Sequence, residues 1–253
     1  MYAQDAYTEN RIAIVMTQQT VIVRQAHERG QADFGWLKSA HTFSFGQYHD
    51  PKHMQYGVLR VINDDEVDGG GGFPAHPHSD AEIFSYVLEG ALEHKDSMGN
   101  GSIVGTGGVQ YMSAGSGVTH SEFNPSATDR MRFLQVWLIP KERGTEPRYQ
   151  TLNISPDEKR GQLKLFMSPD GHAGSIKTRA AASVYAATLD GDEQIEHELG
   201  TIPKAWIQVA RGSLTINGKS LSKGDGVAID GGGRVTMNHG DDAEVLLFEI
   251  QQG

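Results

Sequence analysis

The sequence predicts an all-β protein, and three observations favour this fold class. Apolar residues fall in short runs, nearly all four to nine residues long, a length typical of strands. Helical periodicity of about 3.6 residues is scarce along the chain. Glycine accounts for 31 of the 253 residues, which suits a chain whose short strands are joined by many turns.

The expected strands form two groups. The first group is residues 57–63, 83–88, 109–112 and 131–139. The second group is residues 205–209, 214–216, 226–229 and 244–250. Residues 141–158 between the groups are rich in charge, proline and glycine, which indicates a linker. This arrangement favours a sandwich or a barrel in each half.

The two halves share an internal repeat. Residues 87–92 and 209–214 both read V-x-x-G-x-L, and a Gly-Val step follows each within 20 residues. Each half then closes on an apolar strand. The hexapeptide alone is short enough to recur by chance, but the shared order of three features favours a duplicated β domain. We expect an extension at 1–15, a first domain at 16–145 and a second domain at 146–253.

Composition excludes several classes of protein. The 32 acidic and 22 basic side chains give a net charge of −10, which opposes direct binding to nucleic acid or to anionic lipid. The chain has no cysteine, so thiolate metal sites and thiol nucleophiles are absent. No apolar run approaches the ~20 residues of a membrane helix. We therefore expect a cytoplasmic protein without a signal peptide or membrane anchor.

Two pairs of polar residues predict a metal centre. His76 and His78 are two residues apart, and so are His120 and Glu122 further along the chain. Residues i and i+2 of a strand share a face, so each pair can point in one direction. If the two strands lie across a small barrel, three imidazole nitrogens and a carboxylate converge, a set suited to Fe, Ni, Cu, Zn or Mn. Such a set leaves positions open for oxygen or substrate.

Two alternatives stay open on this reasoning. An isolated H-x-H pair is common as a surface or structural feature, although the combined pattern of four residues is far more specific. Glu82 follows His78 by four residues and shares its face if no bulge intervenes. Strand parity therefore does not choose between Glu82 and Glu122 as the carboxylate ligand.

The same residues lie in motifs that resemble those of known proteins. Gly70 followed by His76-x-His78-x-x-x-Glu82 resembles the first cupin motif, and Gly117-x-x-His120-x-x-x-Asn124 resembles the second. More narrowly, the sequence resembles the pirin family of bicupins. The matching stretches are HTFSF (41–45), LRVINDD (59–65), HPH (76–78), LEG (88–90), HKDSMGN (94–100), MSAG (112–115) and HSE (120–122).

The resemblance implies a bicupin, with two cupin-type β-barrels packed face to face and one metal in the N-terminal barrel. In this family the ligands match His76, His78, His120 and Glu122, whereas other cupins often use the carboxylate at Glu82. We follow the narrower family, which leaves Glu82 as a neighbour that orients an imidazole. Availability in a cell favours Fe2+, with Ni, Cu, Zn, Mn or Co as alternatives.

The resemblance also implies an activity. Similar proteins are assigned quercetin 2,3-dioxygenase activity, in which O2 opens a flavonol and carbon monoxide leaves. Glu122 would then be both ligand and catalytic base, taking the proton of the flavonol 3-hydroxyl. The alternative is a non-enzymatic regulator that binds a protein partner in a metal-dependent way. A third reading, an isomerase or a sugar-binding cupin, is allowed by the fold alone.

The second half lacks a matching ligand set. Counting from the corresponding glycines places Glu198, Gly200 and Met237 where the first half has its histidines. We therefore expect the second barrel to be structural. His41, His49 and His94 are weaker candidates for lining the pocket.

Overall fold

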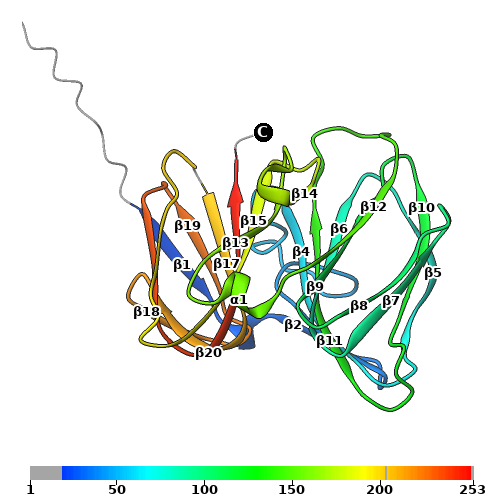
Figure 1. Ribbon diagram of the computed structural model, residues 1–253, viewed down its shortest axis with the longest axis horizontal. Helices are drawn as coiled ribbons and strands as arrows, with labels where there is room; N and C mark the ends of the chain where they lie inside the picture. Colours follow the sequence, from blue (N-terminus) through cyan, green and yellow to red (C-terminus); the bar gives the residue numbers. More distant parts are fainter. Residues whose placement is uncertain (1–18, 203, 252–253) are drawn as a thin grey trace, which may run out of the picture.

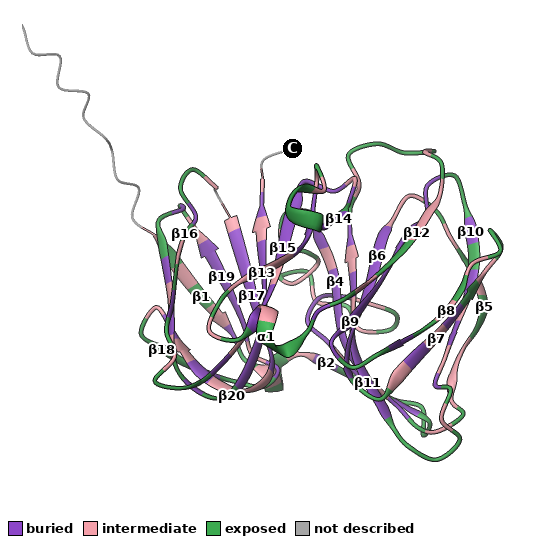
Figure 2. Ribbon diagram, in the orientation of Figure 1, coloured by how far each residue is buried: buried purple, intermediate pink, exposed green. Residues whose placement is uncertain are grey.

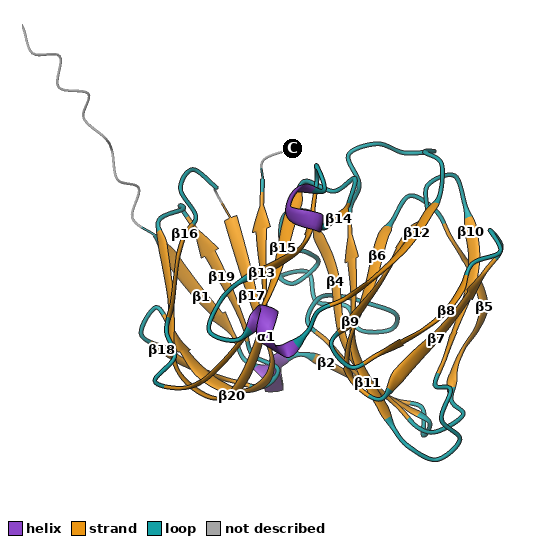
Figure 3. Ribbon diagram, viewed as in Figure 1, coloured by secondary structure: helices purple, strands orange, loops and turns teal. Residues whose placement is uncertain are grey.

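The computed structural model describes residues 19–202 and 204–251, and it is built almost entirely of strands (Figures 1 and 3). Two β-barrels lie side by side, one from each half of the chain. The all-β bicupin prediction is confirmed. The predicted extension at 1–15 lies outside the described residues.

Two sheets form the N-terminal barrel. The seven-stranded sheet has the order β12-β9-β6-β11-β4-β3-β2, and the four-stranded sheet has the order β5-β10-β7-β8. The strands of the first sheet are β2 (Gly30–Asp33), β3 (Leu37–His41), β4 (Leu59–Val67), β6 (Glu82–Glu89), β9 (Gly108–Ser113), β11 (Met131–Leu138) and β12 (Arg148–Asn153). Those of the second are β5 (Gly72–His78), β7 (Ala91–Asp96), β8 (Gly101–Gly105) and β10 (Val118–Phe123). The four-stranded sheet is the wall farther from the other barrel (Figure 1).

One nine-stranded sheet forms the C-terminal barrel. Its strands are β1 (Thr20–Arg24), β13 (Lys164–Ser168), β14 (Ile176–Lys177), β15 (Ala182–Gly191), β16 (Ile195–Glu198), β17 (Lys204–Ile216), β18 (Lys219–Ser222), β19 (Gly226–Asp230) and β20 (Arg234–Ile250). The pairing of β17 with β20 shifts register three times, and such bulges bend long strands around a barrel. The helices are short: η1 (Ala26–Glu28), α1 (Pro156–Lys159) and η2 (His172–Gly174).

The sheets do not follow the predicted domain boundaries. β1 precedes the first barrel in sequence but pairs with β19 of the second. β12 comes after residue 145 but pairs with β9 of the first barrel. Apolar patterning shows that a segment is a strand but not which sheet it joins, so an exchange of edge strands between barrels leaves no local signal.

A continuous apolar layer joins the barrels, and it is seen as buried strands in the middle of the molecule (Figure 2). Phe84 of the first barrel contacts Phe166 and Phe248 of the second, with ring centroids 5.6 and 6.3 Å apart. Arg132 crosses the same interface, donating to Asp64 at 2.8 and 3.0 Å and to the carbonyl of Ala210 at 2.8 Å. These contacts place the seven-stranded sheet on the side of the N-terminal barrel that faces the C-terminal barrel.

The interiors of the two barrels differ. The second is filled by an aliphatic core that includes Val209, Val235, Met237 and Leu247, all about 0–1% exposed. Met237, at the position that corresponds to His120 of the first half, packs in this core. The first barrel instead carries polar side chains on the middle of its strands, between apolar clusters. Both clusters of candidate metal ligands found among the described residues lie in the first barrel.

Candidate metal centre

Three histidines converge inside the N-terminal barrel. His76 and His78 lie on β5, and antiparallel pairing with β10 places His120 opposite His76. The ring centroids of the three are 4.5–4.9 Å apart. One ligand nitrogen from each lies within 4.8 Å of the others. Alternation along β5 and the register with β10 together produce the cluster that the sequence predicts.

The nitrogens of this cluster fit a divalent metal ion. His76 Nδ1 lies 2.7 Å from the carbonyl oxygen of Pro74, which fixes the tautomer and leaves Nε2 free. Nε2 of His120 is buried and has no hydrogen-bond partner among the described residues. Burial lowers the pKa of His78 to about 4 and that of His120 to about 3, so both imidazoles are neutral at pH 7. Neutral imidazoles with unshared lone pairs are the form that binds a metal.

Glu122 lies beside His120 but at the edge of the histidine cluster. A carboxylate oxygen of Glu122 and one ring nitrogen each of His94 and His120 lie within 4.8 Å of one another. This cluster is distinct from the triplet of His76, His78 and His120. The pairing of β10 with β5 slips between residues 120 and 122, where β5 has one extra residue, so Glu122 lies opposite Phe73 and farther along β5 from His76. The structure thus brings three of the four predicted ligands together and sets the fourth next to one of them.

Hydrogen bonds hold the Glu122 carboxylate in place. Gln110 Nε2 donates to Oε1 and Gln135 Nε2 donates to Oε2, both at 2.8 Å, and the Ser85 hydroxyl donates to Oε1 at 3.2 Å. Burial raises the pKa of Glu122, while the nearby histidine His94 and the hydrogen bonds from Ser85 and Gln135 act in the opposite direction. The carboxylate is therefore positioned by its neighbours. Sequence reasoning missed the two glutamines, although each interrupts an apolar strand.

His94 contacts the ring of His120 and holds it in place. The two Nδ1 atoms are 3.4 Å apart, and His94 Nε2 lies 3.1 Å from Asp96 Oδ2. The ring of His94 is fully buried and stacks on Tyr149 at 4.4 Å. This chain of contacts fixes the orientation of the His120 ring. Of the weaker candidates, His41 lines the cavity described below, and no described contact joins His49 to the cluster.

Glu82 does not occupy the position expected from strand parity. The chain reverses at Asp80, whose φ is +52°, so β5 ends at His78 and Glu82 begins β6 in the other sheet. Its buried carboxylate accepts hydrogen bonds from Tyr111, Ser113 and Thr178 and from the backbone N–H of Arg179. None of these donors is a histidine. The expectation that Glu82 orients an imidazole is therefore wrong, because the turn moves it to the interface between the barrels.

We expect the Glu82→Gln variant to lower the free energy of unfolding without loss of metal. The amide presents N–H groups where the carboxylate accepts hydrogen bonds, which costs about 2–4 kcal/mol for a buried charged acceptor. Urea unfolding at pH 7 measures this change, with Glu89→Gln at the exposed end of β6 as the control. Loss of metal at unchanged stability would instead return Glu82 to the predicted role beside an imidazole.

A cavity of about 590 Å3 opens onto the cluster. His76, His78 and Glu122 line one side of it. Its walls include the aromatic rings of Phe34, Phe45, Tyr48, Phe73 and Trp137. Trp137 stands edge-on against His78 with ring centroids 4.9 Å apart. The volume and the apolar walls suit a flat ligand of moderate size.

The fold and the cluster together define a bicupin with a histidine-rich candidate metal site in its N-terminal barrel. Comparison with family models agrees: the pirin model matches residues 22–138, and the model of the quercetinase C-terminal cupin domain matches residues 165–250. The chain belongs to the pirin family.

Relatives cover most of the chain. A protein of Escherichia coli K12 named quercetin 2,3-dioxygenase is 46% identical over 230 residues, which is 91% of this chain and 98% of that protein. A pirin-like protein of Caulobacter vibrioides is 39% identical, covering 87% of this chain and 95% of its own length. The crystal structure of the bacterial pirin YhhW from E. coli in complex with nickel(II) has a TM-score of 0.87 and 44% identity, covering 92% and 100% of the two chains.

One further finding concerns membranes. Within residues 19–202 and 204–251, no helix has the length and apolar character needed to cross a bilayer.

Proposed function

We propose that this protein is a metal-dependent dioxygenase that opens a flavonol such as quercetin with O2 and releases carbon monoxide. The observation that carries the proposal is a cavity lined by His76, His78, the buried carboxylate of Glu122 and aromatic walls, with His120 beside the two histidines. The names of the relatives support the same activity.

His76, His78 and His120 are the residues that would hold the metal, with Glu122 approaching from the side of His120. A divalent metal bound there would act as a Lewis acid and favour the ionised 3-hydroxyl of the flavonol. We propose Fe2+ from its availability in cells, and the nickel complex of YhhW is evidence that a related site accepts another ion. His78 and His120 are neutral at pH 7, so they would leave the charge of a bound cation uncompensated, and that charge would attract an anionic ligand.

The carboxylate of Glu122 is the proposed base. It lines the cavity and lies next to His120, so it can take the proton of a 3-hydroxyl directed at the histidine cluster. Gln110 and Gln135 each donate to a different oxygen of this carboxylate, which restricts its rotation. The aromatic walls exclude water from the flavonol ring while it reacts with O2.

The metal-loaded protein should consume O2 in the presence of quercetin and release carbon monoxide. An oxygen electrode and a haemoglobin-based assay for carbon monoxide measure the two quantities. Flavones without the 3-hydroxyl should be inert, because they offer neither a proton to Glu122 nor an oxyanion to the site. Loss of flavonol without carbon monoxide would contradict the dioxygenase assignment and favour a metal-dependent regulator.

A further inference from the structure

A group of polar side chains lines the cavity on the sheet opposite the histidines. Ser39 and His41 lie on β3, and Asn63 and Asp65 lie on β4 of the seven-stranded sheet, whereas β5 and β10 belong to the four-stranded sheet. Antiparallel pairing places His41 opposite Asn63 and Ser39 opposite Asp65. All four side chains therefore share the cavity face, as the alternation of a strand requires. We call these four residues the polar ladder.

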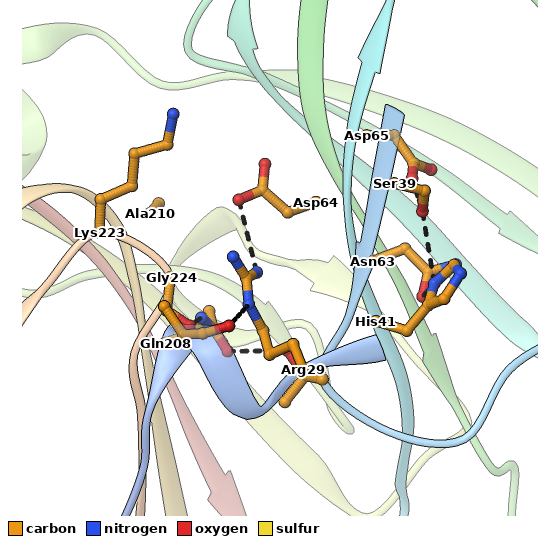
Figure 4. Close-up of polar contacts among 12 residues, drawn as sticks. Arg29, Ser39, His41, Asn63, Asp64, Asp65, Gln208, Ala210, Lys223 and Gly224 are labelled. Carbon is orange, nitrogen blue, oxygen red and sulfur yellow. Dashed lines mark hydrogen bonds and ion pairs between the residues drawn. The ribbon is translucent and has the colours of Figure 1, made fainter. Parts of the chain in front are cut away.

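One residue of β4, between two members of the polar ladder, faces the interface between the barrels instead of the cavity. Asp64, between Asn63 and Asp65, turns the other way and pairs with Arg29 at 3.5 Å (Figure 4). Asp65 and Ser39 point toward each other on the opposite side of the strand (Figure 4). Among the described residues no ion pair joins Asp65 to a cation, although the members of the ladder are only 3–6% exposed.

Hydrogen bonds inside the ladder fix the role of each atom. The Ser39 hydroxyl donates to Asp65 Oδ1. His41 Nδ1 lies 2.8 Å from Asn63 Oδ1, which is an acceptor, so Nδ1 carries the proton. Burial lowers the pKa of His41, and its ring is therefore neutral at pH 7 with a lone pair on Nε2.

Three polar atoms of the ladder remain for a ligand. His41 Nε2, Asn63 Nδ2 and Asp65 Oδ2 have no hydrogen-bond partner among the described residues. These three atoms are not completely shielded from solvent, and their residues line the cavity. The wall therefore presents two acceptors and one donor to whatever occupies the cavity. Burial raises the pKa of Asp65 to about 7, so its carboxyl group also donates in part near neutral pH.

We infer that the polar ladder recognises phenolic hydroxyl groups on the part of an aromatic ligand that points away from the histidines. A hydroxyl both donates and accepts, so it matches a wall that offers both kinds of atom. An aromatic ring without hydroxyl groups would leave these buried polar atoms unpaired. The site would therefore bind such a ligand much more weakly than one that carries the hydroxyls. The ladder thus selects polyhydroxylated flavonols over bare ones. The inference rests on the proposed function for the class of ligand but not for the reaction.

The test compares two ligands by anaerobic titration calorimetry on the nickel-loaded protein. Quercetin and 3-hydroxyflavone share the 3-hydroxyl, and only quercetin carries further hydroxyls on its rings. We expect quercetin to bind the unmodified protein at least about 10-fold more tightly. His41→Phe and Asp65→Leu each replace a polar atom of the ladder by an apolar side chain, so they should bring this ratio close to one while the affinity for 3-hydroxyflavone stays the same. Lys38→Ala, on the exposed side of β3, is the control and should keep the ratio.

Each outcome decides the inference. Asp65→Leu keeps a similar shape and removes a buried carboxyl group, so it remains informative if His41→Phe fails to fold. A ratio unchanged in Asp65→Leu overturns the inference, and so does an equal loss of affinity for both ligands. Failure of the unmodified protein to bind quercetin overturns it as well. Because turnover is not measured, a protein that keeps this selectivity without releasing carbon monoxide supports the ladder while the dioxygenase proposal fails.

Discussion

Replacing Glu122 with glutamine should lower flavonol turnover by about 10²–10⁴-fold, the usual contribution of a general base. The amide has nearly the same shape and keeps the barrel packed, but it cannot take a proton from the 3-hydroxyl. It also weakens metal binding, because a neutral oxygen replaces a charged one beside His120. Carbon monoxide release at saturating metal measures the first effect separately from the second.

A matched control lies on the neighbouring strand. Glu93 precedes His94 on β7 and forms an ion pair with Lys95 at 2.7 Å, so its side chain is on the other face of the sheet. Glu93→Gln should keep full activity. If Glu122→Gln turned over quercetin as fast as the control, the proton would have to leave through another group.

The His120→Ala variant should lose nearly all bound metal, falling from one ion per chain to a small fraction. It removes a buried nitrogen that has no hydrogen-bond partner among the described residues, and we expect metal affinity to fall by more than about 100-fold, the upper range for residues that only support a ligand. Elemental analysis after dialysis measures the stoichiometry. The barrel should remain folded, because apolar clusters on either side of the site hold it without an ion.

The control for this variant is a histidine of the other barrel. His197 lies 2.6 Å from Glu249, in a barrel whose described residues contain no cluster of candidate ligands. His197→Ala should keep one ion per chain. Two ions in the unmodified protein, or full occupancy in His120→Ala, would contradict a single site in the N-terminal barrel.

Much of the candidate site could be predicted from the sequence, because it depends on local geometry. The positions of His76 and His78 follow from the alternation of a strand, which is a property of two neighbouring residues. The position of Glu82 does not, because the tight turn at Asp80 changes the sheet to which the next residues belong. Glu122 is an intermediate case, since a single bulge changes its place relative to β5.

The supporting residues required the tertiary structure. Gln110 and Gln135 are close in space because β9 and β11 both pair with β6. The apolar pattern of each strand does not indicate this pairing. Asn63 and Asp65 lie within a motif that the family resemblance had already singled out. Their part in the cavity became apparent only when β3 was placed beside β4.

The exchange of edge strands makes each half of the chain depend on the other. Each barrel completes its sheet with a segment contributed from across the boundary, β1 in one direction and β12 in the other. A cut between residues 145 and 146 would therefore leave each fragment with an exposed sheet edge and missing a strand. The two halves share a sequence repeat, but neither half contains all the strands of one barrel. Loss of residues 146–253 would remove the edge strand β12 from the first barrel and expose the apolar layer that joins the barrels. The second barrel therefore supports the first, although its described residues contain no cluster of candidate ligands.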